Sequence, residues 1–100
     1  MGENDFQDYR EIKGTVASLR LDSVVGLGYG LSRSKAAESV KAGLVQVNEV
    51  TVFDPAARIK EEDIINFSRR GSLELENVMG KSRKGRQNII LKKYYDRREG

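Results

Sequence analysis

Residues 31–48, LSRSKAAESVKAGLVQVN, hold a helix, its end and the start of a strand within a few positions. Ser32 is a residue type that caps helix N-termini, and Gly43 suits the left-handed position just after a helix. Small apolar residues between them recur at helical spacing: Ala36, Ala37 and Val40. After Gly43 the apolar residues alternate, which is the period of a strand. The stretch therefore predicts a short helix that leads directly into a strand.

Upstream of this stretch, the sequence predicts a strand followed by another helix. EIKGTVASL, residues 11–19, alternates weakly and predicts the strand. RLDSVVGLGYG, residues 20–30, has Leu21, Val24 and Val25 at helical spacing. Interior glycine disfavours a helix by about 1 kcal/mol relative to alanine. We therefore expect the glycines of this segment to end the helix early and to let the next helix pack closely: Gly26, Gly28 and Gly30.

Downstream, the period of two continues to the end of the chain. LVQVN and VTVF flank Asn48-Glu49, which predicts a tight hairpin turn. DPAARI predicts a turn into a short extended piece, and EEDIINFSRR predicts a solvated acidic turn before a strand whose Ile65 and Phe67 face one way. SLELENV and QNIILKKYY predict two further strands on either side of a basic loop, GKSRKGRQ, residues 80–87.

These elements predict an α+β fold in which two short packed helices lie on a small, mostly antiparallel sheet. One hundred residues are enough for one domain. We expect that domain to span residues 10–95, with flexible segments at residues 1–9 and 96–100. No internal repeat or second domain is visible in the sequence.

The composition argues against several classes of function. The chain has no Cys and no His, which removes thiol nucleophiles, imidazole bases, disulfides and the usual zinc ligands. The glycines of GLGYG and the MGKS stretch both lack the spacing of nucleotide-binding loops. We therefore expect a non-catalytic protein without cofactor, metal or small-molecule substrate. No apolar run is long enough for a membrane span, and the acidic start is unlike a secretory signal, so we expect a cytoplasmic protein.

The charge is unevenly distributed along the chain. The net charge of +3 is modest, but residues 81–100 alone sum to +6, whereas residues 61–80 sum to −3. Clustered cations of this kind indicate an anionic partner, and they typically contact phosphates without reading sequence. Four cations of the basic loop are candidate phosphate contacts: Lys81, Arg83, Lys84 and Arg86. The alternative is a tail that only keeps the domain soluble.

A second cationic cluster lies at the predicted start of the helix after Ser32. A helix N-terminus presents unpaired backbone N–H groups that bind phosphate, and the helix dipole disfavours cations there. Arg33 and Lys35 nevertheless occupy this turn, with the hydroxyls of Ser32 and Ser34 beside them. An external polyanion would supply the missing negative charge, so the cluster is a candidate phosphate site. An ordinary solvated helix end is the alternative.

Residues 20–65 resemble the S-four (alpha-L) RNA-binding domain, a family named after a small-subunit ribosomal protein. The family pattern is R-L-D, a short helix, S-R-S, a hydrophobic helix ending in Gly, V-x-V-N and a final D-x-I. Its elements fall in order on the following residues: Arg20-Leu21-Asp22, Ser32-Arg33-Ser34, Ala36, Gly43, Val45-Gln46-Val47-Asn48 and Asp63-Ile64. The flanks, TVASLRLD and the later KGR segment, resemble the C-terminal part of the YlmH-like proteins of bacteria and plastids.

This resemblance implies binding of structured RNA, chiefly ribosomal or transfer RNA, by a ribosome-associated monomer in the cytoplasm or, in a photosynthetic eukaryote, the plastid stroma. It also implies that four cations face the phosphates and that the hairpin at Asn48 approaches the RNA. The four cations are Arg20, Arg33, Lys35 and Lys41. The chain departs from the family at two glycines, which are Glu49 and Glu62 here. A type I′ turn would force Glu49 to positive φ, so we expect another turn type, and we expect Glu62 to be a harmless variation.

Three other functions remain open from the sequence. Two helices joined by a glycine-containing turn superficially match a DNA-binding helix-turn-helix. Similar domains are attached to RNA-modifying enzymes, which leaves open an accessory role beside a catalytic domain. A protein-docking role is the third.

Overall fold

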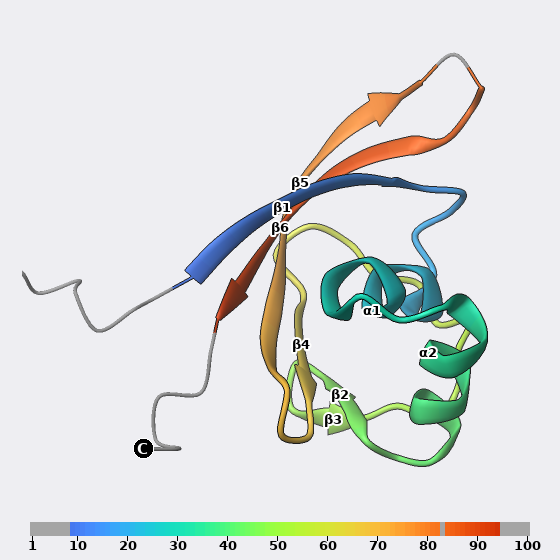
Figure 1. Cartoon of the computed structure of the whole chain (residues 1–100), viewed down its shortest axis with the longest axis vertical. Coiled ribbons are helices and arrows are strands. Elements are labelled where there is room, and N and C mark those ends of the chain that lie inside the picture. Colours follow the sequence, from blue (N-terminus) through green and yellow to red (C-terminus); the bar gives the residue numbers. More distant parts are fainter. Residues whose placement is uncertain (1–8, 83, 95–100) are drawn as a thin grey trace, which may run out of the picture.

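The computed structural model describes residues 9–82 and 84–94, which form two helices on one antiparallel sheet (Figure 1). The elements in chain order are β1 (Tyr9–Val16), α1 (Leu21–Tyr29), α2 (Arg33–Lys41), β2 (Val45–Val47), β3 (Val50–Thr51), β4 (Ile64–Phe67), β5 (Gly71–Lys81) and β6 (Gln87–Tyr94). The strand order across the sheet is β1-β6-β5-β4-β2-β3, and all pairs are antiparallel. The predicted α+β class is therefore confirmed.

Two predicted boundaries shift in the structure. Tyr9, assigned from sequence to the flexible N-terminal segment, is the first residue of β1 and lies opposite Tyr94 of β6. Lys81, assigned to the basic loop, is the last residue of β5, because the β5–β6 ladder continues as far as its pairing with Gln87. Residues 1–8 and 96–100, where we expected flexible ends, lie outside the described residues, and so does Tyr95, which we assigned to the domain.

The core lies between the two helices and one face of the sheet. Ile65 and Phe67 of β4 both point into it, as the alternation predicted. Leu73 and Leu75 of β5 and Ile89 and Leu91 of β6 extend the same apolar layer, and all four side chains are buried. Neither helix of the described part of the chain is long or apolar enough to cross a membrane.

Helix α2 begins and ends where the sequence predicted. The Ser32 hydroxyl accepts a hydrogen bond from the backbone N–H of Lys35, at 3.1 Å, which satisfies one of the unpaired donors of the first turn. Gly43 has a φ of 80° just after the helix, a conformation that glycine adopts at little cost. Ala36 and Val40 are fully buried on the side of α2 that faces the core.

Helix α1 runs further than predicted. It continues through Gly26 and Gly28 to Tyr29 and ends at Gly30, so the glycines do not shorten it. Gly28 instead allows α1 to approach β5, since a Cβ at Gly28 would lie 2.3 Å from Cδ1 of Leu73. Gly28 thus permits a close contact with the sheet, whereas Gly26 lies against the link to the next helix, since a Cβ at Gly26 would be 2.9 Å from the Leu31 carbonyl oxygen.

The β2–β3 turn corrects two further expectations. Asn48 and Glu49 have φ values of 50° and 70°, the pattern of the type I′ turn that Glu49 was expected to prevent. Glu62 also has positive φ, at 75°, so its place in the family pattern requires a left-handed conformation and is not a harmless variation. The sheet fixes the backbone conformation at both residues, so each carries the strain of a positive φ.

We predict that Glu49→Gly and Glu62→Gly each stabilise the domain by about 1 kcal/mol, because glycine adopts positive φ without the Cβ clash. The free energy of unfolding from urea titration measures the effect. Glu38→Gly is the matched control, since Glu38 is exposed in the middle of α2, and it should destabilise the domain by about 1 kcal/mol. Reduced stability in both turn variants would contradict this account.

Asp63 differs from the solvated acidic residue that the sequence predicted. Its side chain is buried and accepts hydrogen bonds from the backbone N–H of Lys60 at 2.9 Å and from the Asn48 amide at 3.0 Å. Burial raises the pKa of Asp63, but these hydrogen bonds and the Lys60 ammonium outweigh it and hold the pKa below its ordinary value. Asp63 thus ties the β2–β3 turn to the segment before β4.

Candidate nucleic-acid interface

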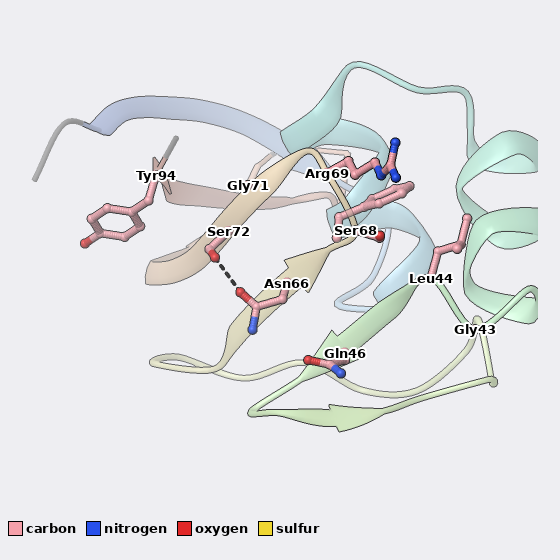
Figure 2. A pocket seen from close by; sticks show the side chains of 10 residues that line it. Gly43, Leu44, Gln46, Asn66, Ser68, Arg69, Gly71, Ser72 and Tyr94 are labelled. Carbon is pink, nitrogen blue, oxygen red and sulfur yellow. Dashed lines mark hydrogen bonds between the residues drawn. The ribbon is translucent and has the colours of Figure 1, made fainter. Parts of the chain in front are cut away.

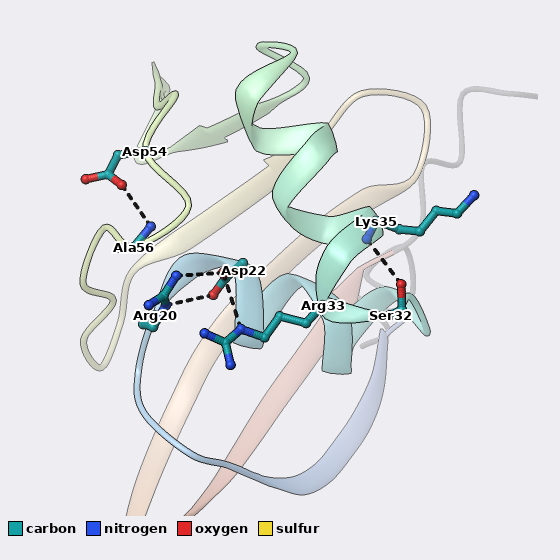
Figure 3. Close-up of polar contacts among 7 residues, drawn as sticks. All are labelled: Arg20, Asp22, Ser32, Arg33, Lys35, Asp54 and Ala56. Carbon is teal, nitrogen blue, oxygen red and sulfur yellow. Dashed lines mark hydrogen bonds and ion pairs between the residues drawn. The ribbon is translucent and has the colours of Figure 1, made fainter.

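The start of α1 and the start of α2 meet around one buried carboxylate (Figure 3). Arg20 donates to both oxygens of Asp22, from Nε at 3.1 Å and from Nη2 at 2.9 Å. Arg33, the first residue of α2, donates from Nε to Oδ2 of the same carboxylate at 3.4 Å. Asp22 is only 2% exposed. Two arginines separated in sequence are therefore positioned by a single side chain.

This arrangement changes the explanation for the cations at the start of α2. Burial raises the pKa of Asp22, but the hydrogen bond and charge of Arg20, together with Arg33, outweigh it and lower the pKa, so the carboxylate stays ionised. Asp22 supplies part of the negative charge that we expected only from an external polyanion. The cluster of Arg20, Asp22 and Arg33 still carries a net charge of +1, which an anion can meet.

The remaining predicted residues of α2 lie on its exposed surface. Ser34 and Lys35 are exposed in the first turn, and the Lys35 side chain extends away from the helix in Figure 3. The Ser32 hydroxyl is engaged in the N-terminal cap. Lys41 is exposed at the opposite end of the helix, about 12 Å along the axis from Arg33. The structure therefore groups Arg20 and Arg33, points Lys35 away from them in the same turn, and places Lys41 at the far end of the helix.

The basic loop connects β5 and β6 and is closed by its own hydrogen bonds. The backbone N–H of Ser82 donates to the Arg86 carbonyl at 2.7 Å, and that of Arg86 donates to the Ser82 hydroxyl at 3.3 Å. Lys81, Lys84 and Arg86 are exposed, and Arg83 lies outside the described residues. The ends of β5 and β6 that flank the loop extend well past the helices (Figure 1). The loop is thus anchored at both ends, as the pairing of the two strands predicted.

Arg86 joins this loop to the end of β1. Its Nε donates to the Thr15 hydroxyl at 3.2 Å, and its Nη2 lies 3.5 Å from the Thr15 carbonyl at the end of β1. Arg86 and Arg33 line the same hollow of about 310 Å³, together with Asp22. The structure therefore brings together one cation from each of the two clusters that the sequence singled out.

Asn48, another predicted contact, is engaged in the fold. Its amide nitrogen donates to Asp63, and its amide oxygen accepts from the backbone N–H of Ile64 at 3.0 Å. Asp22 and Thr15 were not among the predicted site residues. The R-L-D motif contained the signal for Asp22, but nothing near Thr15 in the sequence pointed to Arg86.

A larger pocket of about 540 Å³ lies near the C-terminal end of α2, beside β4 and the β4–β5 turn (Figure 2). Its lining is mostly polar and uncharged, including Gln46, Asn66 and Ser72, and Ser72 donates a hydrogen bond to Asn66. Arg69 is the one cation among the lining residues. This pocket therefore lacks the paired cations of the hollow at Arg33 and Arg86.

Comparison with known proteins defines the class to which this fold and site belong. Residues 19–65 match the S4 domain family, and this part of the chain is an S4 domain. The "Ribosome-associated protein quality control protein P2" of Bacillus subtilis (strain 168), a YlmH-like protein, is 35% identical over 79 residues, or 79% of this chain. The chain is thus a relative of the YlmH-like proteins, and the resemblance seen in the sequence is confirmed.

The fold has a solved counterpart. A structure described as "Crystal structure of pseudouridylate synthase" matches 63% of this chain with a TM-score of 0.51 and 30% sequence identity. The match covers 26% of that structure's chain, and this chain spans 31% of the Bacillus protein. The shared part is therefore a module within longer proteins.

Proposed function

We propose that this chain is a non-catalytic module that binds structured RNA, ribosomal or transfer RNA, in a ribosome-associated process in the cytoplasm. The S4 domain and the ribosome-associated relative support the RNA-binding role. The proposed site rests on one observation: Arg33 from α2 and Arg86 from the β5–β6 loop line the same hollow. We expect the module to bind as a monomer.

The mechanism is phosphate capture by groups that the fold holds in place. Arg20 and Arg33 are fixed by Asp22, Arg86 is fixed by Thr15, and Lys35 adds an exposed ammonium beside the N-terminus of α2. Phosphate contacts fix the position of a nucleic acid without reading its sequence. The module therefore recognises the shape of the RNA backbone, where groove width and the 2′-hydroxyl distinguish RNA from DNA.

Of two alternative functions, DNA reading is disfavoured by the structure, and an accessory role beside an enzyme is compatible with the proposal. A DNA-reading recognition helix needs side chains that reach base edges, whereas α2 buries small apolar residues and its first cation is bound to Asp22. The similarity to a pseudouridylate synthase supports an accessory role beside a catalytic domain. That role also uses RNA binding and would not change the site.

Competition between RNA and DNA tests the proposal. A labelled fragment of ribosomal RNA bound to the chain should be displaced by unlabelled structured RNA at a concentration at least about tenfold lower than by duplex DNA of equal length and charge, at fixed salt. Equal competition by the DNA would indicate a purely electrostatic binder, and it would contradict the assignment to RNA.

We predict that the basic loop contributes two to three phosphate contacts. Removing one such contact should reduce the slope of log affinity against log salt by roughly 0.7 to 0.9. Changing the four cations of the loop to Ser should therefore weaken binding to every RNA and reduce the slope by roughly 1.4 to 2.7: Lys81, Arg83, Lys84 and Arg86. Lys13→Ser is the control, because Lys13 is an exposed cation of β1 that does not belong to the loop.

Two outcomes would count against this prediction. A weaker affinity without a change of slope would mean that the loop supports the fold and makes no phosphate contact. An unchanged affinity and slope would favour the solubility role that the charge distribution also allows.

A further inference from the structure

The hollow at Arg33 and Arg86 is built from five segments of the chain, including α2, which contributes Arg33. Thr15 comes from the end of β1, Ser23 and Leu27 from α1, Leu31 from the link between the helices, and Arg86 from the β5–β6 loop. Its volume of about 310 Å³ is at the lower end of the range for small-ligand sites, about 300 to 1,000 Å³. The hollow is therefore large enough for a group bigger than a phosphate.

Both arginines at the hollow are held in place before any ligand binds. The Nε of Arg33 donates to Asp22, and the Nε of Arg86 donates to Thr15. Among the described residues, the Nη atoms of Arg33 have no hydrogen-bond partner, and its side chain is 56% exposed. Guanidinium groups present donors in a fixed planar fork that suits phosphate. Because their positions are already fixed, less side-chain entropy is lost on binding.

The wall of the hollow has a chemistry that a phosphate alone would not use. Leu27 and Leu31 are both half-buried, and each leaves apolar surface in the hollow beside the arginines. The Ser23 hydroxyl offers a hydrogen bond on the same wall. The Asp22 carboxylate also lines the hollow, but Arg20 and Arg33 both pair with it, so the site remains cationic with Arg86 included. The lining suits a ligand that is anionic at one end and flat and apolar at the other.

We propose that this hollow receives one unstacked nucleotide of the bound RNA. The phosphate of that nucleotide lies between Arg33 and Arg86, and its base lies against Leu27 and Leu31. This inference rests on the proposed RNA-binding function and adds a preference, namely for structured RNA that carries an unpaired nucleotide. A continuous duplex keeps its bases stacked inside the helix and can offer the hollow only its backbone.

Three RNAs separate this proposal from RNA binding in general. One is a short hairpin with a single unpaired adenosine in its stem, the second has an abasic ribose in place of that adenosine, and the third is fully paired. The wild-type chain should bind the first about tenfold tighter than the second, because the base of the adenosine buries apolar surface against Leu27 and Leu31. The abasic and fully paired hairpins should bind with similar affinity.

Two variants test whether the preference for the bulged hairpin arises in the hollow. Ser23→Leu narrows the hollow and keeps both arginines, so it should remove the tenfold difference between the bulged and the abasic hairpin. Ser39→Leu is the matched control, because Ser39 is a half-buried serine on the other helix, and it should keep the difference. Should Ser23→Leu fail to fold, Ala17→Leu narrows the same hollow from an exposed position, with Ala42→Leu as its control.

The outcomes distinguish the two proposals. Equal binding of the bulged and abasic hairpins by the wild-type chain would overturn the nucleotide site and leave the RNA-binding function standing. A preference for the bulged hairpin that survives both Ser23→Leu and Ala17→Leu would overturn its location in the hollow. Failure to bind any of the three RNAs would overturn the RNA-binding function itself.

Discussion

Reversing the charge of Arg33 and Lys35 together is expected to reduce the affinity for structured RNA by at least about 100-fold. Each residue is placed to make a charge-assisted contact to phosphate, and such contacts contribute roughly 1.5 to 3 kcal/mol each. The double variant Arg33→Glu with Lys35→Glu replaces both with repulsion. Fluorescence anisotropy with labelled ribosomal RNA measures the change in affinity, and circular dichroism checks the fold.

The structure determines which control this experiment needs. A carboxylate at residue 33 suits the helix dipole, but it would lie beside Asp22, whose oxygen is now 3.4 Å from the Arg33 Nε. The gain in stability that the dipole alone predicts is therefore not expected. Arg33→Gln with Lys35→Gln removes both cationic side chains without this repulsion and should also weaken binding.

A second control matches the change in net charge. Arg10→Glu with Lys13→Glu alters the same number of charges at two exposed residues of β1, away from the α2 N-terminus. It should reduce the affinity far less. Comparable reductions in the two double variants would mean that only the net charge matters, and the site at α2 would be wrong.

Removing the buried carboxylate is expected to have the largest effect on the fold. Asp22→Ala should lower the free energy of unfolding by about 2 to 3 kcal/mol, because Arg20 and Arg33 both lose the buried carboxylate with which they pair. That is a large share of a total that is typically about 5 to 15 kcal/mol for a domain. RNA affinity should fall as well, since both guanidinium groups lose their fixed positions. Urea titration and RNA binding measure the two effects.

Asp54→Ala is the control for this experiment. Asp54 also lies near Arg20, but it is exposed, and among the residues that the structure describes its carboxylate accepts only the backbone N–H of Ala56, at 2.9 Å (Figure 3). Its removal should cost less than about 1 kcal/mol. A similar drop in stability in the two variants would show that the burial of Asp22 is unimportant.

The same carboxylate gives the stability a pH dependence. The pKa of Asp22 is lowered in the folded state from an ordinary value of 3.8, so its contribution is fully present above about pH 4 and is lost as the pH falls through the folded pKa. Asp63 contributes in the same direction. The acid unfolding of Asp22→Ala should therefore be less steep than that of the wild-type chain.

The local elements of this protein were largely predictable from its sequence. Ser32, Gly43 and the spacing of Ala36 and Val40 define α2 through capping, backbone conformation and periodicity, all of which act within a few residues. The switch to a period of two predicted the strands, and the clusters around Arg33 and the β5–β6 loop were visible as runs of charge. The S4 resemblance likewise depends on motifs in a fixed order along the chain.

The tertiary structure alone decided how these parts meet. Gly28 stays helical because α1 must approach Leu73, and Glu49 and Glu62 adopt positive φ because the sheet fixes their backbones. Contacts across the fold determine these conformations, and they override the local preferences that sequence patterns report. The site depends on the same kind of contact. Thr15 and Arg86 are 71 residues apart and meet only because β1 pairs with β6, so no spacing in the sequence could place Arg86 beside Arg33.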